Sequence, residues 1–149
     1  MSIMITKRNG KKEILDITKI QKMTIPATYE LEGTNQSELE VDSHIKFVDG
    51  MSSADIQQSL IDTAVEKIDI DRPNWTFVAA RLKLFDLYHN VGAKLNSKKG
   101  TPYGHLKDYI DYGINEAEKL IPSLADGYDL EDLNNHIEPE RDFLFNYLG

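Results

Sequence analysis

The sequence contains no cysteine, and this absence excludes several kinds of chemistry. Disulfide bonds, thiolate zinc sites and thiol or thiyl radical reactions all require the sulfur of that side chain. A chain without cysteine is compatible with a reducing compartment. We therefore expect a cytoplasmic protein that has no redox-active group of its own.

Long apolar runs and glycine-rich phosphate loops are also missing. No segment approaches the roughly 18 apolar residues of a membrane span, and the N-terminus has no signal-peptide core, so we expect no membrane partner. Neither GxxxxGKS/T nor GxGxxG occurs, so a nucleotide site would have to be built in another way. The histidines, His44, His89, His105 and His136, lack the spacing of metal ligands, and we predict no metal site.

The charge is uneven along the chain. The formal net charge of the 149 residues is -8 at pH 7, but the first 23 residues hold six Lys or Arg against two acidic residues. That segment carries +4 and the remainder -12. A long polyanion would meet mostly repulsion, which argues against nucleic acid as a partner, whereas a small anion could bind near the N-terminus.

Residues 3–16 give the clearest strand signal. Two short β-prone runs flank Asn9-Gly10, a dipeptide that supplies the positive φ angles of a tight turn. We predict a small β-hairpin there. From Thr18 the pattern becomes helical, with a capping-box spacing between Thr18 and Gln21 and an apolar face that recurs until Gly33. Pro26 predicts a kink or an early end of this helix.

Two further helices are expected to begin at capping boxes. Ser37 and Glu40 begin one of them, and Ser52 and Asp55 begin the next. The predicted buried stripe of the first is Val41, His44, Ile45 and Val48, and that of the second is Ile56, Leu60, Ile61, Ala64, Val65 and Ile68. A fourth, central helix is predicted over residues 73–91, since its apolar residues lie on more than one face.

Residues 93–104 are rich in Gly, Lys and Ser and predict a linker between residues 1–92 and residues 105–149. The last part is expected to form short helices. They are placed around 106–110, 117–124 and 130–137, with breaks at Gly113, Pro122 and Gly127.

The hairpin and the start of the first helix hold charges that suit a nucleotide. These residues are Lys7, Arg8, Glu13, Asp16 and Lys19. The cations are natural partners of phosphate oxygens, and the carboxylates can accept hydrogen bonds from an exocyclic amine or a ribose hydroxyl. A solvated hairpin with ordinary surface charges explains the same spacing, so both interpretations stay open at this point.

Ser52 and Ser53 lie at the predicted start of the third helix. Unpaired amides and the helix dipole favour an anion there. Capping alone explains Ser52 and is its simpler role.

Three blocks of the sequence carry a family resemblance. They are ITKRNGKKEILDITKI, FVDGMSSADIQQSLIDTAVEKI and PNWTFVAARLKLFDLYHNVG. In this order and spacing they resemble the ATP-cone, the regulatory module at the N-terminus of the class Ia ribonucleotide reductase large subunit. The likeness covers about residues 3–92. The later stretches YGHLKDYIDYG and PERDFLFNYLG are similar to the segment that leads into the reductase barrel.

The resemblance implies a fold and a ligand. The fold is a mainly α four-helix bundle capped by a β-hairpin or three-stranded sheet and followed by short helices. The ligand is ATP, which favours the active enzyme, or dATP, which inhibits it, with Mg2+ expected beside the phosphates. Lys7 and Arg8 would contact the phosphates, while Glu13, Asp16 and Lys19 would line the adenine and sugar end.

Other nucleotide-binding positions follow from the same resemblance. Ser53 matches a hydroxyl near the phosphates, and Asp55 matches an acidic residue linked to discrimination between ATP and dATP. Gln57 stands where close relatives often have histidine, and His89 stands where a phosphate-contacting lysine is common. These two departures predict weaker phosphate binding or an altered preference between the two nucleotides.

We expect an allosteric domain of ribonucleoside-diphosphate reductase that sets overall activity in deoxyribonucleotide synthesis, and hence DNA replication, by shifting the oligomeric state. Its expected partners are the rest of the large subunit, the radical-generating small subunit and a homo-oligomer. This chain cannot be the catalyst, because the parent enzyme uses cysteine radical and dithiol chemistry. It is expected to be an N-terminal fragment.

An alternative is a degenerate cone that acts only as a protein–protein interaction module, which Gln57, His89 and Pro26 motivate. An independent hydrolase is disfavoured because no nucleophile, metal site or phosphate loop is present. A zinc-containing repressor family also carries ATP-cones, but its metal ribbon needs four cysteines.

Overall fold

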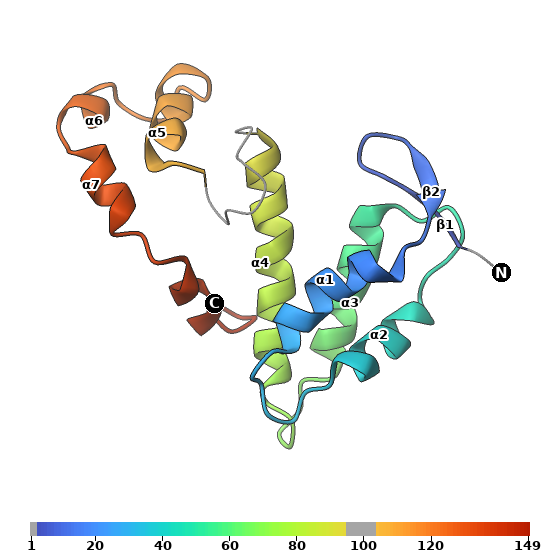
Figure 1. Cartoon of the computed structure of the whole chain (residues 1–149). Helices are drawn as coiled ribbons and strands as arrows, with labels where there is room; N and C mark the ends of the chain where they lie inside the picture. Colours follow the sequence, from blue (N-terminus) through green and yellow to red (C-terminus); the bar gives the residue numbers. More distant parts are fainter. Residues whose placement is uncertain (1–2, 95–103) are drawn as a thin grey trace. The chain divides into compact units, whose positions relative to one another are not determined.

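Figure 1 shows the computed structural model of the chain, which describes residues 3–94 and 104–149. The described part is mainly helical, with one small antiparallel sheet near the N-terminus, so the expected mainly α fold is confirmed. The chain forms two compact units. The first unit is Met1–Leu84 with Phe143–Gly149, and the second unit is Phe85–Asp142.

The sheet is the predicted hairpin. Strand β1 (Met4–Thr6) pairs antiparallel with β2 (Lys12–Ile14). In the turn, the Gly10 N–H donates to the Lys7 carbonyl and the Lys7 N–H donates to the Lys11 carbonyl, both at 2.8 Å. Gly10 has a φ of +80°, a conformation that glycine adopts without steric cost, which explains why the turn forms at this position.

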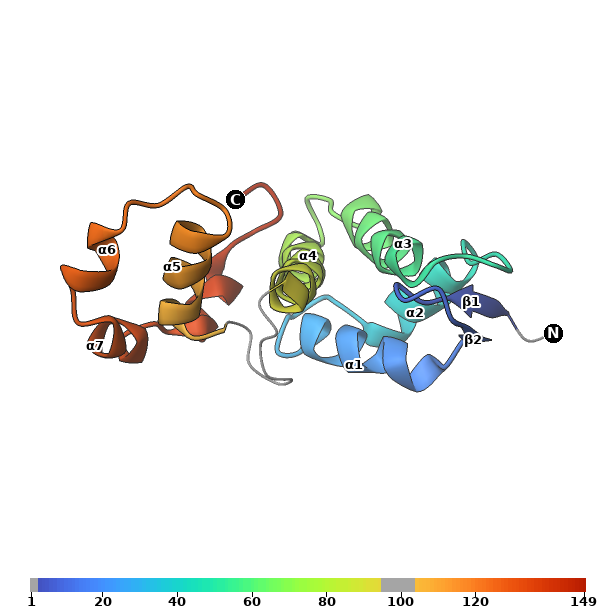
Figure 2. The same cartoon turned by 90° about the horizontal axis from the view of Figure 1, so that it is seen from above.

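A segment that precedes the third helix lies along the free side of β1. The Gly50 N–H donates to the Met4 carbonyl at 2.8 Å, and the Thr6 N–H donates to the Met51 carbonyl at 2.9 Å. Thr6 and Ser52 form an isolated parallel bridge. The hairpin is therefore fixed to the chain just before the third helix, and Figure 2 shows it at one end of the helices of the first unit.

The cap of helix α1 (Ile17–Thr28) lies two residues before the one that the sequence predicts. Asp16 is the cap, because its Oδ1 accepts a hydrogen bond from the Thr18 N–H at 2.9 Å, so the prediction of Thr18 as the cap is wrong. Pro26 lies inside the last turn of the helix. The helix ends two residues later, which confirms the expected early end.

Helix α2 (Gln36–His44) also starts from an unpredicted cap. Asn35 precedes the helix in an extended conformation, and its Oδ1 accepts from the Glu38 N–H at 3.1 Å. The predicted cap, Ser37, lies within the first turn instead. An Asn side chain reaches the free amides of the first turn as well as Ser does, so local spacing alone did not distinguish the two.

The predicted buried face of α2 is wrong. Val41, Ile45 and Val48 are exposed at 61%, 78% and 62%. The buried residues are Leu39 and Ser43, with Phe47 just beyond the helix. Leu39 and Ser43 precede Val41 and Ile45 by two positions, about 200° around a helix, so the face opposite to the predicted one is buried.

Helices α3 (Ser53–Glu66) and α4 (Trp75–Lys94) complete the bundle. The predicted capping box of α3 is confirmed, since Ser52 and Asp55 bond reciprocally across the first turn. Helix α4 begins two residues after Pro73. The fully buried large apolar side chains are Leu39, Leu60, Ile61, Trp75, Val78 and Leu82.

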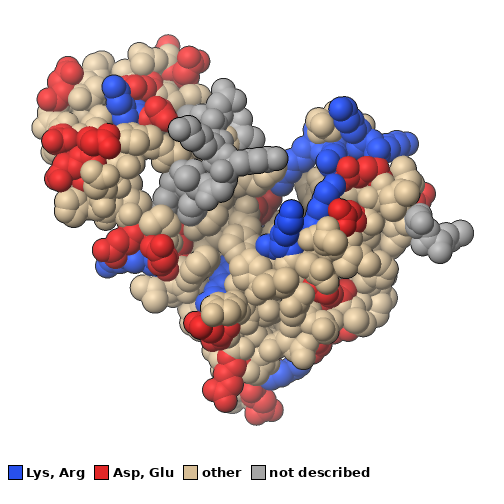
Figure 3. Space-filling view, viewed as in Figure 1, with Lys and Arg blue, Asp and Glu red and all other residues tan. Residues whose placement is uncertain are grey.

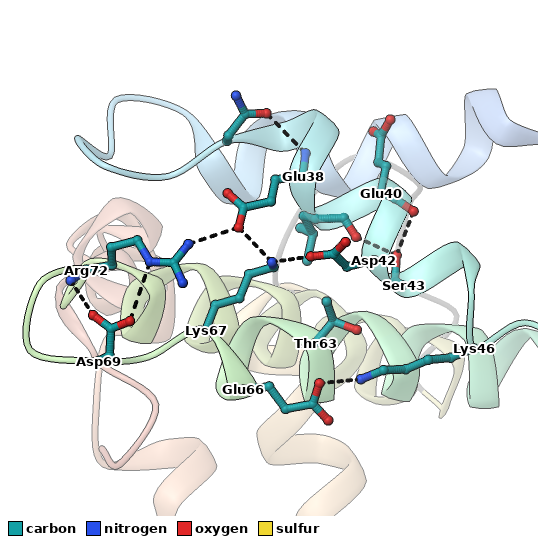
Figure 4. A network of polar contacts seen from close by, with 12 residues as sticks. Glu38, Glu40, Asp42, Ser43, Lys46, Thr63, Glu66, Lys67, Asp69 and Arg72 are labelled. Atoms are coloured by element: carbon teal, nitrogen blue, oxygen red, sulfur yellow. Dashed lines mark hydrogen bonds and ion pairs between the residues drawn. The ribbon is translucent and has the colours of Figure 1, made fainter.

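A polar network fixes α2 to the end of α3 (Figure 4). The Lys67 ammonium bonds to Glu38 at 2.7 Å and to Asp42, and it lies 5.4 Å from the centre of the Trp75 ring. Arg72 also bonds to Glu38, at 2.9 Å. Burial opposes the charge of Lys67, but hydrogen bonds to the two carboxylates raise its pKa. The hydrogen bond from Lys67 lowers the pKa of Glu38.

The second unit contains the short helices expected near the C-terminus. They are α5 (Leu106–Asn115), α6 (Ser123–Asp126) and α7 (Leu130–Asn135), followed by the 3-10 helix η1 (Pro139–Leu144). The predictions around 106–110 and 130–137 are confirmed, whereas only a single turn forms near 117–124. Residues 95–103, most of the predicted linker, lie outside the described residues.

The predicted break at Gly113 is wrong. This residue is buried inside α5, and a Cβ atom added there would lie 2.4 Å from the side chain of Leu120. The glycine therefore permits close packing instead of ending the helix. Pro122 and Gly127 do bound α6, as predicted.

Candidate functional site

Glu13 joins two of the predicted lysines into one group, which we call the hairpin site (Lys7, Glu13 and Lys19). Its Oε2 lies 3.0 Å from the Lys7 ammonium at the end of β1, and its Oε1 lies 2.6 Å from the Lys19 ammonium in the first turn of α1. Strand β2 carries the carboxylate between them. The tight hairpin and the helix that follows it at once thus bring three distant charges together.

The electrostatics of the hairpin site follow from this geometry. Hydrogen bonds from Lys19 and then Lys7 lower the pKa of Glu13, and the bond to Glu13 raises the pKa of Lys19. The Lys7 and Lys19 side chains remain 40% and 49% exposed. Exposed ion pairs of this kind are weak, so an incoming anion can compete with Glu13 for both ammonium groups.

Arg8 lies in the exposed turn of the hairpin, directly after Lys7. Figure 3 shows Lys and Arg side chains gathered over the hairpin, beside acidic residues. Asp16 has a definite structural role, because its Oδ1 accepts from the N–H of Thr18 at 2.9 Å and from its hydroxyl at 2.7 Å. These bonds lower the pKa of Asp16.

The start of α3 lies next to the hairpin because of the Thr6–Ser52 bridge. The Ser52 hydroxyl donates to Asp55 Oδ2 at 2.6 Å and accepts from the Asp55 N–H at 3.0 Å. Ser53 is the first residue of the helix, where free amides and the helix dipole favour negative charge. The pairing of β1 with this segment therefore places the cations of the hairpin near the N-terminus of α3, which favours anions.

The two atypical positions have different surroundings. Gln57 lies one turn beyond Ser53 and is 6% exposed, and its Nε2 donates to the Leu82 carbonyl of α4 at 2.8 Å. Its donor thus joins two helices of the bundle. His89 is exposed on the part of α4 that belongs to the second unit.

A pocket between α1 and α2 was not anticipated. It has a volume of about 380 Å3 and is lined mainly by apolar side chains, among them Ile17 and Ile20 of α1, Val41 of α2 and Ile45 directly after α2. The signal was present in the sequence as the stripe of apolar residues on α2. Because such a stripe predicts a buried face, the sequence pattern alone does not indicate the pocket.

No group of three or more metal-ligating side chains occurs in the described residues 3–94 and 104–149. Within the same residues no helix has both the length and the apolar composition that crossing a bilayer requires.

Comparison with known families matches residues 3–90 to the ATP cone domain. The chain belongs to this family. The match begins one residue before β1 and ends within α4, so the cone comprises the hairpin and helices α1 to α3 together with most of α4. Membership of the family supports a nucleotide-binding regulatory role.

Similar proteins include alpha subunits of ribonucleoside-diphosphate reductase. The chain is 54% identical to the Helicobacter pylori subunit over 147 residues, which is 99% of this chain and 18% of the relative. It is 30% identical to the Haemophilus influenzae subunit and 28% identical to the alpha subunit of ribonucleoside-diphosphate reductase 1 from Escherichia coli, over 149 residues, which is 98% of this chain and 19% of each relative. The chain thus spans less than a fifth of the length of these relatives.

Proposed function

We propose that this cone binds ATP or dATP at the hairpin site and the start of α3, and so regulates a ribonucleoside-diphosphate reductase. The observation that carries the proposal is the double ion pair of Glu13 with Lys7 and Lys19. It holds two exposed ammonium groups on either side of one carboxylate, next to a helix N-terminus. This arrangement offers cations for a polyphosphate and an acceptor for the nucleoside.

Binding would exchange partners within the hairpin site. Phosphate oxygens would take the ammonium group of Lys7 and the guanidinium of Arg8, while amides at the start of α3 and the Ser53 hydroxyl would donate to the same oxygens. Lys19 would line the adenine and sugar end with Glu13 and Asp16. Glu13, released from its lysines, would accept a hydrogen bond from the adenine amine or a ribose hydroxyl. This exchange replaces weak internal ion pairs with contacts to the ligand.

Further residues complete the proposed site. Asp16 would lie at the sugar end of the nucleotide and would still cap α1. Asp55 would contribute to the discrimination between ATP and dATP. Gln57 would lie near the phosphates. Mg2+ is proposed to enter with the phosphates, because this ion usually keeps most of its ligands from water and phosphate oxygens.

The regulatory effect is proposed to be a population shift. A nucleotide that binds one oligomeric arrangement better than another must favour that arrangement. The affected partners would be the rest of the large subunit, further copies of it and the radical-generating small subunit. In this proposal residues 1–92 are the cone, 93–104 are a linker and 105–149 lead toward the reductase barrel.

A second candidate is an interaction module that no longer binds a nucleotide. The exposed apolar side chains of α2 and the pocket between α1 and α2 favour it, since contiguous apolar surface often marks a binding surface. The engagement of the Gln57 amide with α4 points the same way.

Titration calorimetry with ATP and dATP tests the proposed function. We expect saturable binding that Lys7→Ala combined with Arg8→Ala abolishes. The matched control is Lys107→Ala combined with Lys119→Ala, which removes two exposed lysines of the second unit and leaves binding unchanged. Absence of heat and of a thermal shift at millimolar nucleotide would contradict the proposal. Assembly that light scattering finds identical with and without nucleotide would favour the interaction module.

A further inference from the structure

Both ends of helix α1 are bonded to other elements of the first unit. Its first turn carries Lys19 of the hairpin site, and its last turn is held by Arg81 of α4. The Arg81 Nη1 donates to the Tyr29 carbonyl at 2.8 Å, and to the Pro26 and Ala27 carbonyls at 3.3 Å and 3.4 Å. A cation at this position pairs the free carbonyls of the helix C-terminus and complements its dipole.

The same guanidinium also contacts the C-terminal segment, Phe143–Gly149. The Arg81 Cζ lies 5.2 Å from the centre of the Phe143 ring, a cation–π contact. A second bond holds the segment in place, from the Tyr147 N–H to the Thr76 hydroxyl at 3.1 Å. All of these residues belong to the first unit. Arg81 is therefore shared between the end of α1 and a segment more than 50 residues later in the sequence.

Arg81 is incompletely paired in this arrangement. Its Nε is buried and has no hydrogen-bond partner within the part of the chain that the structure describes. Burial lowers the pKa of this side chain, so its charge is held in surroundings that do not fully satisfy it. A small displacement of the end of α1 changes the number and quality of its bonds. The contact is thus sensitive to the position of α1.

We propose that Arg81 couples the nucleotide site to the segment Phe143–Gly149 through helix α1. This inference rests on the proposed function. When Lys19 exchanges Glu13 for the adenine or sugar of the nucleotide, the first turn of α1 gains a different partner, and the helix transmits the change to the carbonyls that Arg81 binds. The changed bonds of Arg81 then alter its cation–π contact with the Phe143 ring. Because coupling is reciprocal, the packing of Phe143 also affects nucleotide affinity.

The chemistry of Arg81 makes it the positioning residue of this pathway. A guanidinium can donate to carbonyls in its plane and stack on an aromatic ring with its face at the same time. A lysine ammonium offers donors without a planar face. Arg81→Lys therefore keeps the charge at the end of α1 while it weakens the link to Phe143.

Hydrogen exchange of the full chain, with and without dATP and ATP, tests the coupling. We expect nucleotide to change exchange at the hairpin and also to change the exchange rate of the Tyr147 amide by about fivefold or more. In Arg81→Lys and in Phe143→Leu the hairpin still responds, but the Tyr147 response is lost. Leu148→Ala, at a side chain that is 93% exposed, is the matched control and keeps both responses.

Each other outcome overturns the coupling. A wild-type hairpin that responds while Tyr147 does not would show that nucleotide binds without reaching the segment. An unchanged Tyr147 response in both variants would show that Arg81 and Phe143 do not carry it. If neither region of the wild type responds to either nucleotide, the proposed function itself fails, and the coupling fails with it.

Discussion

Glu13 is the residue on which the hairpin site depends, because one carboxylate bonds to both lysines. The sequence predicted that Lys7, Glu13 and Lys19 belong together. It did not predict that the carboxylate would pair with the lysines themselves. That pairing depends on side-chain directions at the hairpin and at the first turn of α1, which the spacing of residues leaves undetermined.

The pKa of Glu13 gives a direct test of this arrangement. We expect its carboxyl to titrate below its ordinary value of 4.5, since Lys19 and Lys7 stabilise the charged form. The stabilisation is complete above that value and is lost as the pH falls through the lowered pKa. In Lys19→Met the pKa moves back toward 4.5, whereas in Lys22→Met, a matched change on the same helix, it stays low. A pH titration followed by NMR measures both, and equal values in the two variants would contradict the bridge.

Lys67 offers a contrast between a buried and an exposed ion pair. Its side chain is 11% exposed and bonds to two carboxylates, whereas Lys46 is 34% exposed and bonds to Glu66 alone at 2.6 Å. We expect Lys67→Met to lower the free energy of unfolding by about 2 kcal/mol, because it removes a largely buried ammonium that bonds to both carboxylates and leaves Glu38 with Arg72. Lys46→Met should cost less than about 1 kcal/mol. Urea unfolding of both variants measures the difference, and equal costs would argue against the network.

At the scale of elements, the sequence predicted where helices occur better than where they begin. The cap of α3 was predicted correctly because Ser52 and Asp55 are close in sequence and form two reciprocal hydrogen bonds with each other. The caps of α1 and α2 were missed because Asp16 and Asn35 stand just outside the predicted starts and accept from amides nearer the start of each helix, those of Thr18 and Glu38. Which competitor caps a helix depends on the direction of the incoming chain, and a local pattern does not contain that direction.

The orientation of α2 is the clearest error of the sequence interpretation, and its observed face can be tested. Leu39→Ala removes a fully buried side chain and should cost about 3 kcal/mol of unfolding free energy. Ile45→Ala alters a side chain that is 78% exposed. This variant should change the free energy of unfolding by no more than about 0.5 kcal/mol. Denaturant unfolding compares the two, and a larger loss in Ile45→Ala would restore the predicted face.

For the whole molecule, the sequence predicted the fold class and the family but could not connect distant parts. The Thr6–Ser52 bridge and the bonds of Arg81 join residues about 46 and 52 to 62 positions apart. Such contacts depend on the packing of complete helices. The Thr6–Ser52 bridge nevertheless determines that the hairpin lies beside the start of α3, and the proposed site uses both.

Nucleotide should therefore stabilise the first unit through its phosphates. At about 100 times the Kd, a bound ligand adds about 2.7 kcal/mol, which should raise the melting temperature by about 5 °C or more. The single tryptophan, Trp75, is fully buried in this unit and reports its melting by fluorescence. Adenosine at the same concentration should give little shift, because it has no phosphate for Lys7 and Arg8.

The dependence of the thermal shift on ionic strength distinguishes binding through the phosphates from binding through the base alone. The lysines of the hairpin site are exposed, so raising the ionic strength from about 0.05 M to 0.5 M should screen them and reduce the shift produced by ATP. Because the chain as a whole is acidic, general attraction between protein and nucleotide cannot produce this dependence. A shift that is equal for ATP and adenosine, or that salt leaves unchanged, would mean that the base and not the phosphates supplies the binding energy.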